Sequence, residues 1–341
     1  MVAPTELVAA AARIAEETLF PAALATDRSP LVPVDLLDQL AAAGLYGLVG
    51  PAEAGGLGAD AATRAAVTEV LAGGCLTTTF VWTQHHGAVH TLAELSHEAV
   101  RREWLGPLCA GARRAGVAFA GLRRPGPPIL TARRSDGAWS FKGTAPWVTG
   151  WGRIDLVHVA ARDDHGQVVW ALVDARESPS LRVQVLPLAA VTASGTVTLR
   201  FDGHLVPDER VTLVEDFDRW RARDAAGLRA NGAFALGVTR RCCALLGPSE
   251  LDGELDDARD QLDRAAPEAV PAARARASLL AMRAASRLVV AGGGRSMLTD
   301  NHAQRLAREA MFLLVFGQTA SIREAQLELD ACLAAGGGGS G

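Results

Sequence analysis

The sequence lacks several patterns that would assign it to a well-known chemistry. No glycine-rich dinucleotide fingerprint follows a strand, no Gly-x-Ser-x-Gly marks a nucleophilic serine, and no His-Glu-x-x-His is present. No apolar run reaches the roughly 18 residues that a membrane helix requires. The N-terminus has no basic start followed by an apolar stretch, so no secretory signal peptide is predicted.

Cysteine is scarce, and its pattern excludes a disulfide scaffold. The chain of 341 residues has five cysteines, an odd number, without a Cys-x-x-Cys motif. Two of them, Cys242 and Cys243, are adjacent on an expected helix. We therefore expect reduced thiols in a cytoplasmic protein.

An excess of charge of one sign is also missing. Lys and Arg number 34, Asp and Glu number 38, and the net formal charge is −4. This balance favours neither nucleic acid nor an anionic membrane surface as a partner. With 49% hydrophobic residues, the chain is long enough for two or three hydrophobic cores.

The first third of the chain, to about residue 110, has the pattern of helices. Pro33 opens a helix that we expect to end at Gly44, and Asp60 is expected to cap another. Residues 77–95 are expected to form a further helix. The glycine-rich segment 50–58 is interpreted as a turn between helices, because no Gly-Lys-Ser/Thr follows it to make a phosphate loop.

Residues 112–213 change to short β-rich runs separated by Gly, Pro and Asp. Their spacing predicts an antiparallel barrel or sandwich. The runs are Val117–Leu122, Ile129–Arg134, Ala138–Lys142, Ile154–Ala161, Val168–Val173, Leu181–Leu186 and Thr196–Phe201. Residues 216–334 return to helix, with a break expected at Gly292–Gly294. The order of helices, strands and helices predicts an α+β fold rather than an alternating α/β fold.

Residues 141–152 are the most informative stretch, with the sequence Phe-Lys-Gly-Thr-Ala-Pro-Trp-Val-Thr-Gly-Trp-Gly. Apolar and polar residues alternate before it, and a second strand is expected over 154–162. Glycine and proline interrupt it four times, so a turn is expected to carry Trp147 and Thr149. Such a turn suits a planar, hydrogen-bonding ring system. The alternative is a hairpin whose tryptophans fill the core.

Five motifs, in this order, resemble those of the acyl-CoA dehydrogenase family. They are Leu48–Gly58, Glu103–Gly111, Gly143–Gly150, Phe201–Pro207 and Arg308–Thr319. The resemblance covers roughly residues 5–330 and implies an N-terminal α-helical domain, a middle antiparallel β-barrel and a C-terminal four-helix bundle. The domains are expected at 1–111, 112–214 and 215–334, followed by a glycine-rich tail or linker at 335–341.

The resemblance implies an FAD site and an acyl-CoA or another acyl thioester as substrate. In the family, a Trp-[Ile/Val]-Thr turn lies against the flavin, a glycine pair lies near the adenosine, and a threonine follows a Glu-Gly pair. The corresponding residues here are Trp147, Val148, Thr149, Gly293, Gly294 and Thr319. Because family members share part of this site between subunits, the resemblance also implies a homo- or hetero-oligomer. An electron-acceptor flavoprotein is a further implied partner.

The catalytic carboxylate of the family is missing at its usual positions. In the family a carboxylate removes the α-proton of the substrate while hydride passes to the flavin. Its two usual positions correspond here to Gly317 and Gly227. Asp224, one helical turn before Gly227, and Asp300, at the start of a helix, are the candidate replacements. The alternative for Asp224 is an ion-paired or solvated helix residue, and for Asp300 a helix cap.

A second departure concerns residues 122–128, which replace the family's Thr-Glu-Pro-x-x-Gly-Ser-Asp loop. Three interpretations follow from the departures. In the first, the base comes from elsewhere and α,β-dehydrogenation is retained. In the second, the flavin is retained with a different reaction, or a partner subunit supplies the chemistry. In the third, the flavin is lost and the protein binds an acyl group or CoA without redox chemistry.

Two further groups are candidate substrate contacts. His85 and His86 lie on a predicted helix near His90, either lining a pocket or in the core, and no third ligand accompanies them, so no metal site is predicted. Arg123 belongs to a set of arginines on the β-rich segment. These arginines either meet a phosphate group or form a solvated face.

Overall fold

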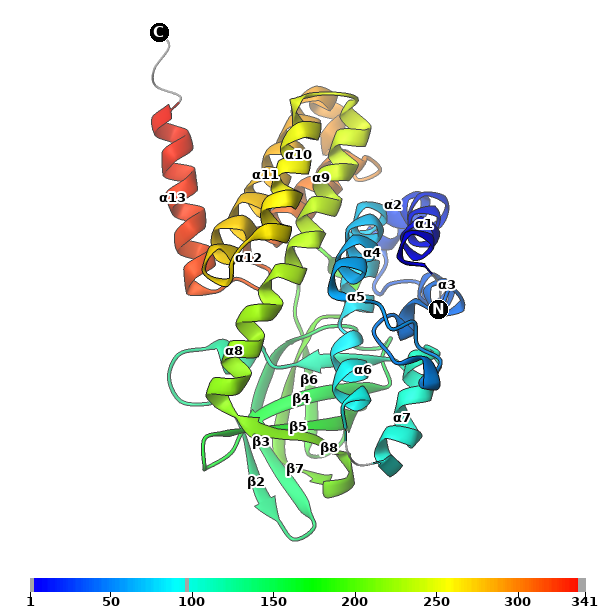
Figure 1. The fold of residues 1–341 in the computed structure, drawn as a ribbon, viewed down its shortest axis with the longest axis vertical. Coiled ribbons are helices and arrows are strands. Elements are labelled where there is room, and N and C mark those ends of the chain that lie inside the picture. The colour runs from blue at the N-terminus through cyan, green and yellow to red at the C-terminus, as the bar shows by residue number, and fades with distance from the viewer. Residues whose placement is uncertain (1–2, 96–97, 337–341) are drawn as a thin grey trace.

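A computed structural model describes residues 3–95 and 98–336 (Figure 1). It consists of helices, then a β-sheet, then helices again, as the α+β prediction requires. The first helices are α1 (Pro4–Ile14), α2 (Phe20–Arg28), α3 (Val34–Ala42), α4 (Ala61–Gly74), α5 (Leu76–Thr83), α6 (His86–Ala93) and α7 (Glu98–Cys109). The later ones are α8 (Phe217–Gly227), α9 (Gly232–Leu246), α10 (Glu250–Arg264), α11 (Val270–Gly292), α12 (His302–Val315) and α13 (Ala320–Gly336).

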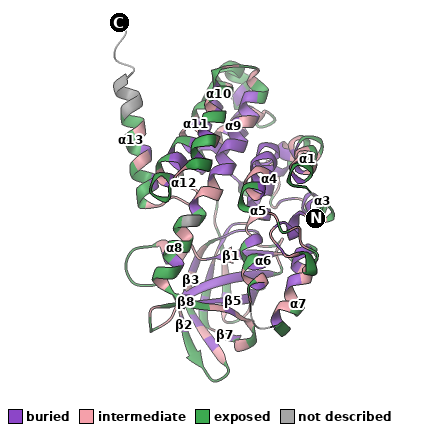
Figure 2. Cartoon of the chain, viewed as in Figure 1, coloured by how far each residue is buried: buried purple, intermediate pink, exposed green. Residues whose placement is uncertain are grey.

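The helix boundaries of the N-terminal segment follow local chemistry. Asp60 accepts a hydrogen bond from the backbone N–H of Thr63 at 2.7 Å and so caps α4, which confirms the prediction. Pro33 stands at the start of α3, and Gly44, with φ +73°, follows its end. Figure 2 shows the buried faces of these helices turned towards one another.

The single helix predicted over residues 77–95 is wrong, because the chain breaks between α5 and α6. Polar side chains at the break bond to carbonyls of the preceding turn. Thr83 donates to the carbonyl oxygens of Thr79 and Phe80, and the Gln84 amide donates to the Phe80 carbonyl. These bonds compete with the helical backbone ladder.

The sheet has eight strands and mixed pairing. The strands are β1 (Ala115–Ala118), β2 (Leu130–Ser135), β3 (Ala138–Val148), β4 (Leu156–Arg162), β5 (Gln167–Asp174), β6 (Leu181–Val185), β7 (Val197–Pro207) and β8 (Val211–Asp216). Seven follow the order β6-β7-β3-β2-β4-β5-β8, and β1 pairs with β4. Most pairs are antiparallel, as predicted, whereas β1 and β2 each pair with β4 in parallel.

The central stretch differs from its prediction. β3 does not stop at Gly143 but continues to Val148, so the expected turn begins only at Thr149. The pairing of β3 with β7 shifts register between Ala145 and Val148. This bulge tolerates Pro146, which has no N–H to donate to a ladder.

Two other β segments also differ from the prediction. β1 ends at Ala118, and Ala120–Arg123 form a 3₁₀ turn rather than the second half of a strand. β8 was not predicted, although it pairs with β5 at the edge of the sheet.

The C-terminal helices α9 to α12 pack against one another around a common core. α13 packs along α11 and stands apart from the other helices in Figure 1. Of the predicted tail at 335–341, residues 337–341 lie outside the described part, and the predicted domain limits remain predictions. In the two described ranges, no helix has the length and apolar character to span a membrane.

Candidate functional site

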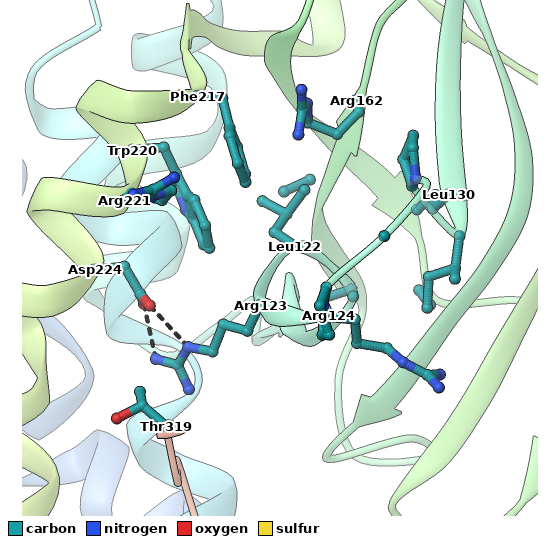
Figure 3. Close-up of a pocket in the computed structure, with 18 of the residues that line it drawn as sticks. Leu122, Arg123, Arg124, Leu130, Arg162, Phe217, Trp220, Arg221, Asp224 and Thr319 are labelled. Atoms are coloured by element: carbon teal, nitrogen blue, oxygen red, sulfur yellow. Dashed lines mark hydrogen bonds and ion pairs between the residues drawn. The ribbon is translucent and has the colours of Figure 1, made fainter. Parts of the chain in front are cut away.

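A cavity of about 690 Å³ lies where the β-sheet meets the C-terminal helices. Its walls come from the 119–129 loop, from β3 and β4, from α8, and from the start of α13. Ten of the residues that line it are labelled in Figure 3: Leu122, Arg123, Arg124, Leu130, Arg162, Phe217, Trp220, Arg221, Asp224 and Thr319. Its volume is in the range typical of small-molecule sites.

The loop that forms one wall is held against β3 by a close backbone approach. The N–H of Thr144 donates to the carbonyl of Ile129 at 2.8 Å. Gly143 has φ +125°, and a Cβ there would lie 2.1 Å from the same carbonyl oxygen. Only glycine fits this position, so Gly143 fixes where the loop crosses the sheet.

Asp224 on α8 and Arg123 in the loop form a bidentate ion pair in the wall of the cavity (Figure 3). Arg123 Nε donates to Asp224 Oδ2 at 2.8 Å and Nη2 donates to Oδ1 at 2.7 Å. The exposed fractions of the two side chains are 23% and 15%. Since both carboxylate oxygens accept from Arg123, Asp224 is not a free base in this arrangement.

Gly317, which corresponds to one usual position of the family's base, lies near the guanidinium of Arg123. Gly317 has φ +60°, and a Cβ there would lie 2.7 Å from Asn231 Nδ2 and 3.8 Å from Arg123 Nη1. The other usual position, Gly227, is exposed at the end of α8. Asp300 is exposed and does not line the cavity. Asn301, and not Asp300, caps α12 by accepting from the Ala303 N–H.

Arg274 on α11 adds a buried cation behind this region. Its side chain is 1% exposed, and Nη2 donates to the Phe316 carbonyl at 3.0 Å. Its Nε and Nη1 have no hydrogen-bond partner among the described residues. Burial, with a smaller effect of the Arg123 charge, lowers the pKa of Arg274 to about 10.

The predicted flavin residues at the end of β3 and just after it lie outside the cavity. Trp147 has φ +62° and is 58% exposed, whereas Val148 is buried in the core of the sheet. The Thr149 hydroxyl is buried and hydrogen-bonds the Thr196 hydroxyl at 3.0 Å. None of the three lines the cavity, although Thr144 of the same strand does.

The predicted residues of the C-terminal helices are divided between two places. Thr319 lines the cavity and accepts a hydrogen bond from the Ile322 N–H in the first turn of α13. Gly293 and Gly294 are exposed beyond the end of α11 and do not line it. The structure therefore brings together Arg123, Asp224 and Thr319.

His85 and His86 are buried away from the cavity and bond to backbone groups. The Ala115 N–H donates to His85 Nδ1 at 3.1 Å, so Nε2 carries the proton and donates to the Leu108 carbonyl. His86 Nε2 lies 3.1 Å from the Leu45 carbonyl. Burial lowers the pKa of His86 to about 4. His85 thus joins α7 to β1, His86 bonds to the turn at Leu45, and neither residue lines the cavity.

Three of the cavity residues that sequence reasoning missed form one stack. The Arg162 guanidinium carbon lies 3.8 Å from the centre of the Phe217 ring, and Phe217 stacks on Trp220 with centroids 5.4 Å apart. Phe217 and Trp220 are three residues apart at the start of α8, so their spacing placed them on one helix face. Nothing in the sequence indicates that this face meets the end of β4.

Comparison with known proteins relates the chain to one family. Residues 4–112 match the family model for the N-terminal domain of acyl-CoA dehydrogenases. L-evernosamine nitrososynthase from a Micromonospora strain is 31% identical over 240 residues, which cover 62% of this chain and 52% of that protein. The match thus spans about half of that relative's length. The 3-sulfinopropanoyl-CoA desulfinase of Paraburkholderia xenovorans is 25% identical, with 95% of each chain covered.

The fold is shared with solved structures over nearly the whole chain. The structure of butyryl-CoA dehydrogenase from Megasphaera elsdenii aligns with a TM-score of 0.82 at 18% identity, covering 97% of this chain and 98% of that one. The family model covers the helical N-terminal segment, and the fold agrees from there to the C-terminal helices. Residues 4–112 thus resemble the N-terminal domain of acyl-CoA dehydrogenases, and the chain as a whole has the acyl-CoA dehydrogenase fold.

Proposed function

We propose that this protein is an FAD-dependent oxidoreductase that acts without a free carboxylate base of its own. The cavity at the junction of sheet and helices is the proposed substrate site. The observation that carries this proposal is the Arg123–Asp224 pair. Asp224 is the one carboxylate among the described residues that line the cavity, and Arg123 binds both of its oxygens. A carboxylate whose two oxygens both accept from a guanidinium is not free to approach an α-proton.

The residues present fit a flavin in part. Thr319 lines the cavity, and Trp147 offers an exposed indole at the end of β3. The Thr149 hydroxyl is already bonded to Thr196, so it is not free for a ligand. FAD, when bound, supplies a two-electron acceptor or donor. The protein's own residues then bind and orient the substrate beside it.

An oligomer is proposed as the form that completes the flavin site. Gly293 and Gly294 lie beside exposed apolar side chains at the end of α11: Val290 is 80% exposed, Met297 64% and Leu298 53%. Exposed apolar side chains that gather in one place are typical of a contact surface. Light scattering after size-exclusion chromatography tests this, with Met297→Asp expected to yield the monomer.

The relatives are named for different reactions. One is a nitrososynthase, another a desulfinase, and a third the human short-chain specific acyl-CoA dehydrogenase. Resemblance to the family therefore leaves the reaction open, and it has to be argued from the residues of the site. The missing free carboxylate favours a reaction other than α-proton abstraction.

A second candidate function is α,β-dehydrogenation of an acyl thioester with Asp224 as the base. It is favoured by the presence of Asp224 in the same cavity as Thr319, with 15% of the side chain exposed. Substrate binding would have to separate Asp224 from Arg123 before the carboxylate takes a proton. An acceptor flavoprotein is the proposed partner for reoxidation in this case.

One experiment separates these functions. The purified protein is reconstituted with FAD and mixed anaerobically with acyl-CoAs of several chain lengths, and the flavin absorbance is followed. We expect retained FAD and no bleaching. Bleaching that disappears in Asp224→Asn establishes dehydrogenation instead. A protein that retains no FAD contradicts both functions.

A further inference from the structure

The cavity carries a large excess of positive charge. Five arginines line it, namely Arg123, Arg124, Arg162, Arg221 and Arg323, against the single carboxylate of Asp224. Arg123 is neutralised by Asp224, and Arg221 lies 3.4 Å from the exposed Asp218. Arg124, Arg162 and Arg323 have no carboxylate partner among the residues described.

Among these arginines, Arg162 is the best placed to bind an anion, because an aromatic contact positions its side chain and no carboxylate neutralises its charge. Its guanidinium lies over the face of Phe217 at 3.8 Å, and Trp220, only 3% exposed, stacks against Phe217 in turn. The Arg162 Nε is buried and has no hydrogen-bond partner. A cation–π contact positions a guanidinium, but it leaves the N–H donors at the edge free for an acceptor.

Arg274, which is buried near Arg123, adds a further positive charge close to the cavity. It is buried, it has two unpartnered nitrogens, and it lies close enough to Arg123 for their charges to repel. A buried cation without a counterion is costly unless an anion nearby offsets it. An anion in the cavity would lower this cost.

Much of the remaining lining is apolar. Leu122, Ile129, Leu130, Ala145 and Ala160 contribute hydrocarbon surface beside the arginines. A ligand that fits both features has an apolar body and one strongly anionic group. Guanidinium groups bind carboxylates and phosphates through paired N–H donors, so both anions are of the right kind.

We propose that the cavity binds a ligand with an apolar body through a carboxylate or phosphate group, which is held by Arg162, Arg124 and Arg323. This inference rests on the proposed function in that the ligand is taken as the substrate. The Arg123–Asp224 pair is a separate, already neutral element of the wall. The substrate class is therefore an anionic one, and the anion is recognised at the end of β4 rather than at Asp224.

Isothermal titration calorimetry of the full chain, with and without FAD, tests the proposal. The probes are pyrophosphate, glutarate and the uncharged glutaramide. We expect one or both anions to bind and glutaramide not to bind. Binding of pyrophosphate alone identifies a phosphate-bearing ligand, and binding of glutarate alone a carboxylate-bearing one.

Variants assign the binding to the cavity. Arg162→Gln and Arg124→Gln are each expected to raise Kd about 10- to 100-fold, the range for loss of a charged hydrogen bond. Arg124 is exposed in the loop and does not touch the aromatic stack, so its variant remains informative if Arg162→Gln fails to fold. Arg182→Gln, on an exposed position of β6 outside the cavity, is the matched control and is expected to bind normally.

The proposal is overturned if neither anion binds at millimolar concentration, or if Arg182→Gln weakens binding as much as the cavity variants do. These outcomes are distinct from failure of the proposed function, which is read from FAD retention by visible absorbance. A protein that retains FAD but binds no anion contradicts only the present inference. A protein that binds anions through Arg124 but retains no FAD contradicts only the flavin assignment.

Discussion

Gly73 on α4 and Gly237 on α9 face each other where the N-terminal helices cross the C-terminal bundle. A Cβ at Gly237 would lie 2.2 Å from the Glu69 carbonyl oxygen and 2.9 Å from the Ala72 Cβ, and a Cβ at Gly73 would lie 3.0 Å from the Gly237 carbonyl oxygen. The two helices approach this closely because neither carries a side chain at the crossing. The contact therefore fixes how α4 and α9 meet.

Gly237→Ala is expected to lower the free energy of unfolding by about 1–3 kcal/mol, the usual cost of overpacking. Urea denaturation followed by circular dichroism measures it. Gly253→Ala on α10 is the control, because a Cβ there meets nothing within 4 Å. The control is expected to be neutral or to stabilise by up to about 1 kcal/mol, since alanine favours a helix over glycine. Equal effects of the two substitutions would contradict the close crossing.

The four cysteines with described side chains are expected to resist thiol reagents. Cys75, Cys109, Cys242 and Cys243 are free and buried. Burial raises the pKa of Cys109 and Cys243 to about 11, and that of Cys242 to about 12. At pH 8 roughly 0.1% or less of such a thiol is the reactive thiolate.

The measurement uses the Cys332→Ser variant, so that only these four thiols remain. With a chromogenic disulfide reagent at pH 8, no thiol of the native protein should react within minutes. Four equivalents should react at once in 6 M guanidinium chloride. A fast equivalent in the native protein would show that one of the four is accessible.

Acid is expected to destabilise the protein through buried neutral histidines. Burial lowers the pKa of His86 from its ordinary value of 6.5 to about 4, and that of His158 to about 3. Below pH 6.5 the unfolded chain takes up protons that these folded-state imidazoles do not bind. Stability is therefore complete above about pH 7 and falls as the pH drops towards 4.

For His86 alone this loss is roughly 3 kcal/mol between pH 7 and pH 4. His86→Gln should be less stable than the parent at pH 7, because its contact with the Leu45 carbonyl changes. Its urea midpoint should then fall less steeply with acid than that of the parent. Parallel pH profiles of the two proteins would show that His86 titrates normally in the fold.

Much of the architecture could be predicted from the sequence, because it depends on local chemistry. The cap at Asp60, the positive φ of Gly44 and the end of α11 at Gly292 all follow from the residues at those positions. The course of β3 past Gly143 and Pro146 could not be predicted. It depends on the pairing with β7 and on a bulge that absorbs the proline, and both are tertiary features.

The site was harder to predict from the sequence, because it too depends on tertiary contacts. Arg123 and Asp224 were each singled out, but they are 101 residues apart, and no local pattern joins them. Arg162 was missed because its position in the cavity depends on contact with Phe217, which belongs to another element. The assignment of flavin contacts to Trp147 and Thr149 rests on the motif and remains a prediction.

The Arg123–Asp224 pair yields the prediction that bears most directly on function. Asp224→Asn removes the negative charge from the cavity and leaves Arg123 without its carboxylate. We expect a loss of about 1–3 kcal/mol in stability, because two hydrogen bonds to a charged group are weakened in a mostly buried place. The extra positive charge should strengthen binding of an anionic ligand roughly fivefold or more.

Asp257→Asn on α10 is the control, since Asp257 is an exposed helix residue and does not line the cavity. It should change stability by less than about 0.5 kcal/mol and leave anion affinity unchanged. The measurements are thermal unfolding and calorimetric titration with pyrophosphate and glutarate. If Asp224→Asn weakens anion binding, Asp224 orders the site through Arg123 and the two residues are part of the ligand-binding surface. If it strengthens binding while FAD is retained, Asp224 acts as an internal counterion of Arg123.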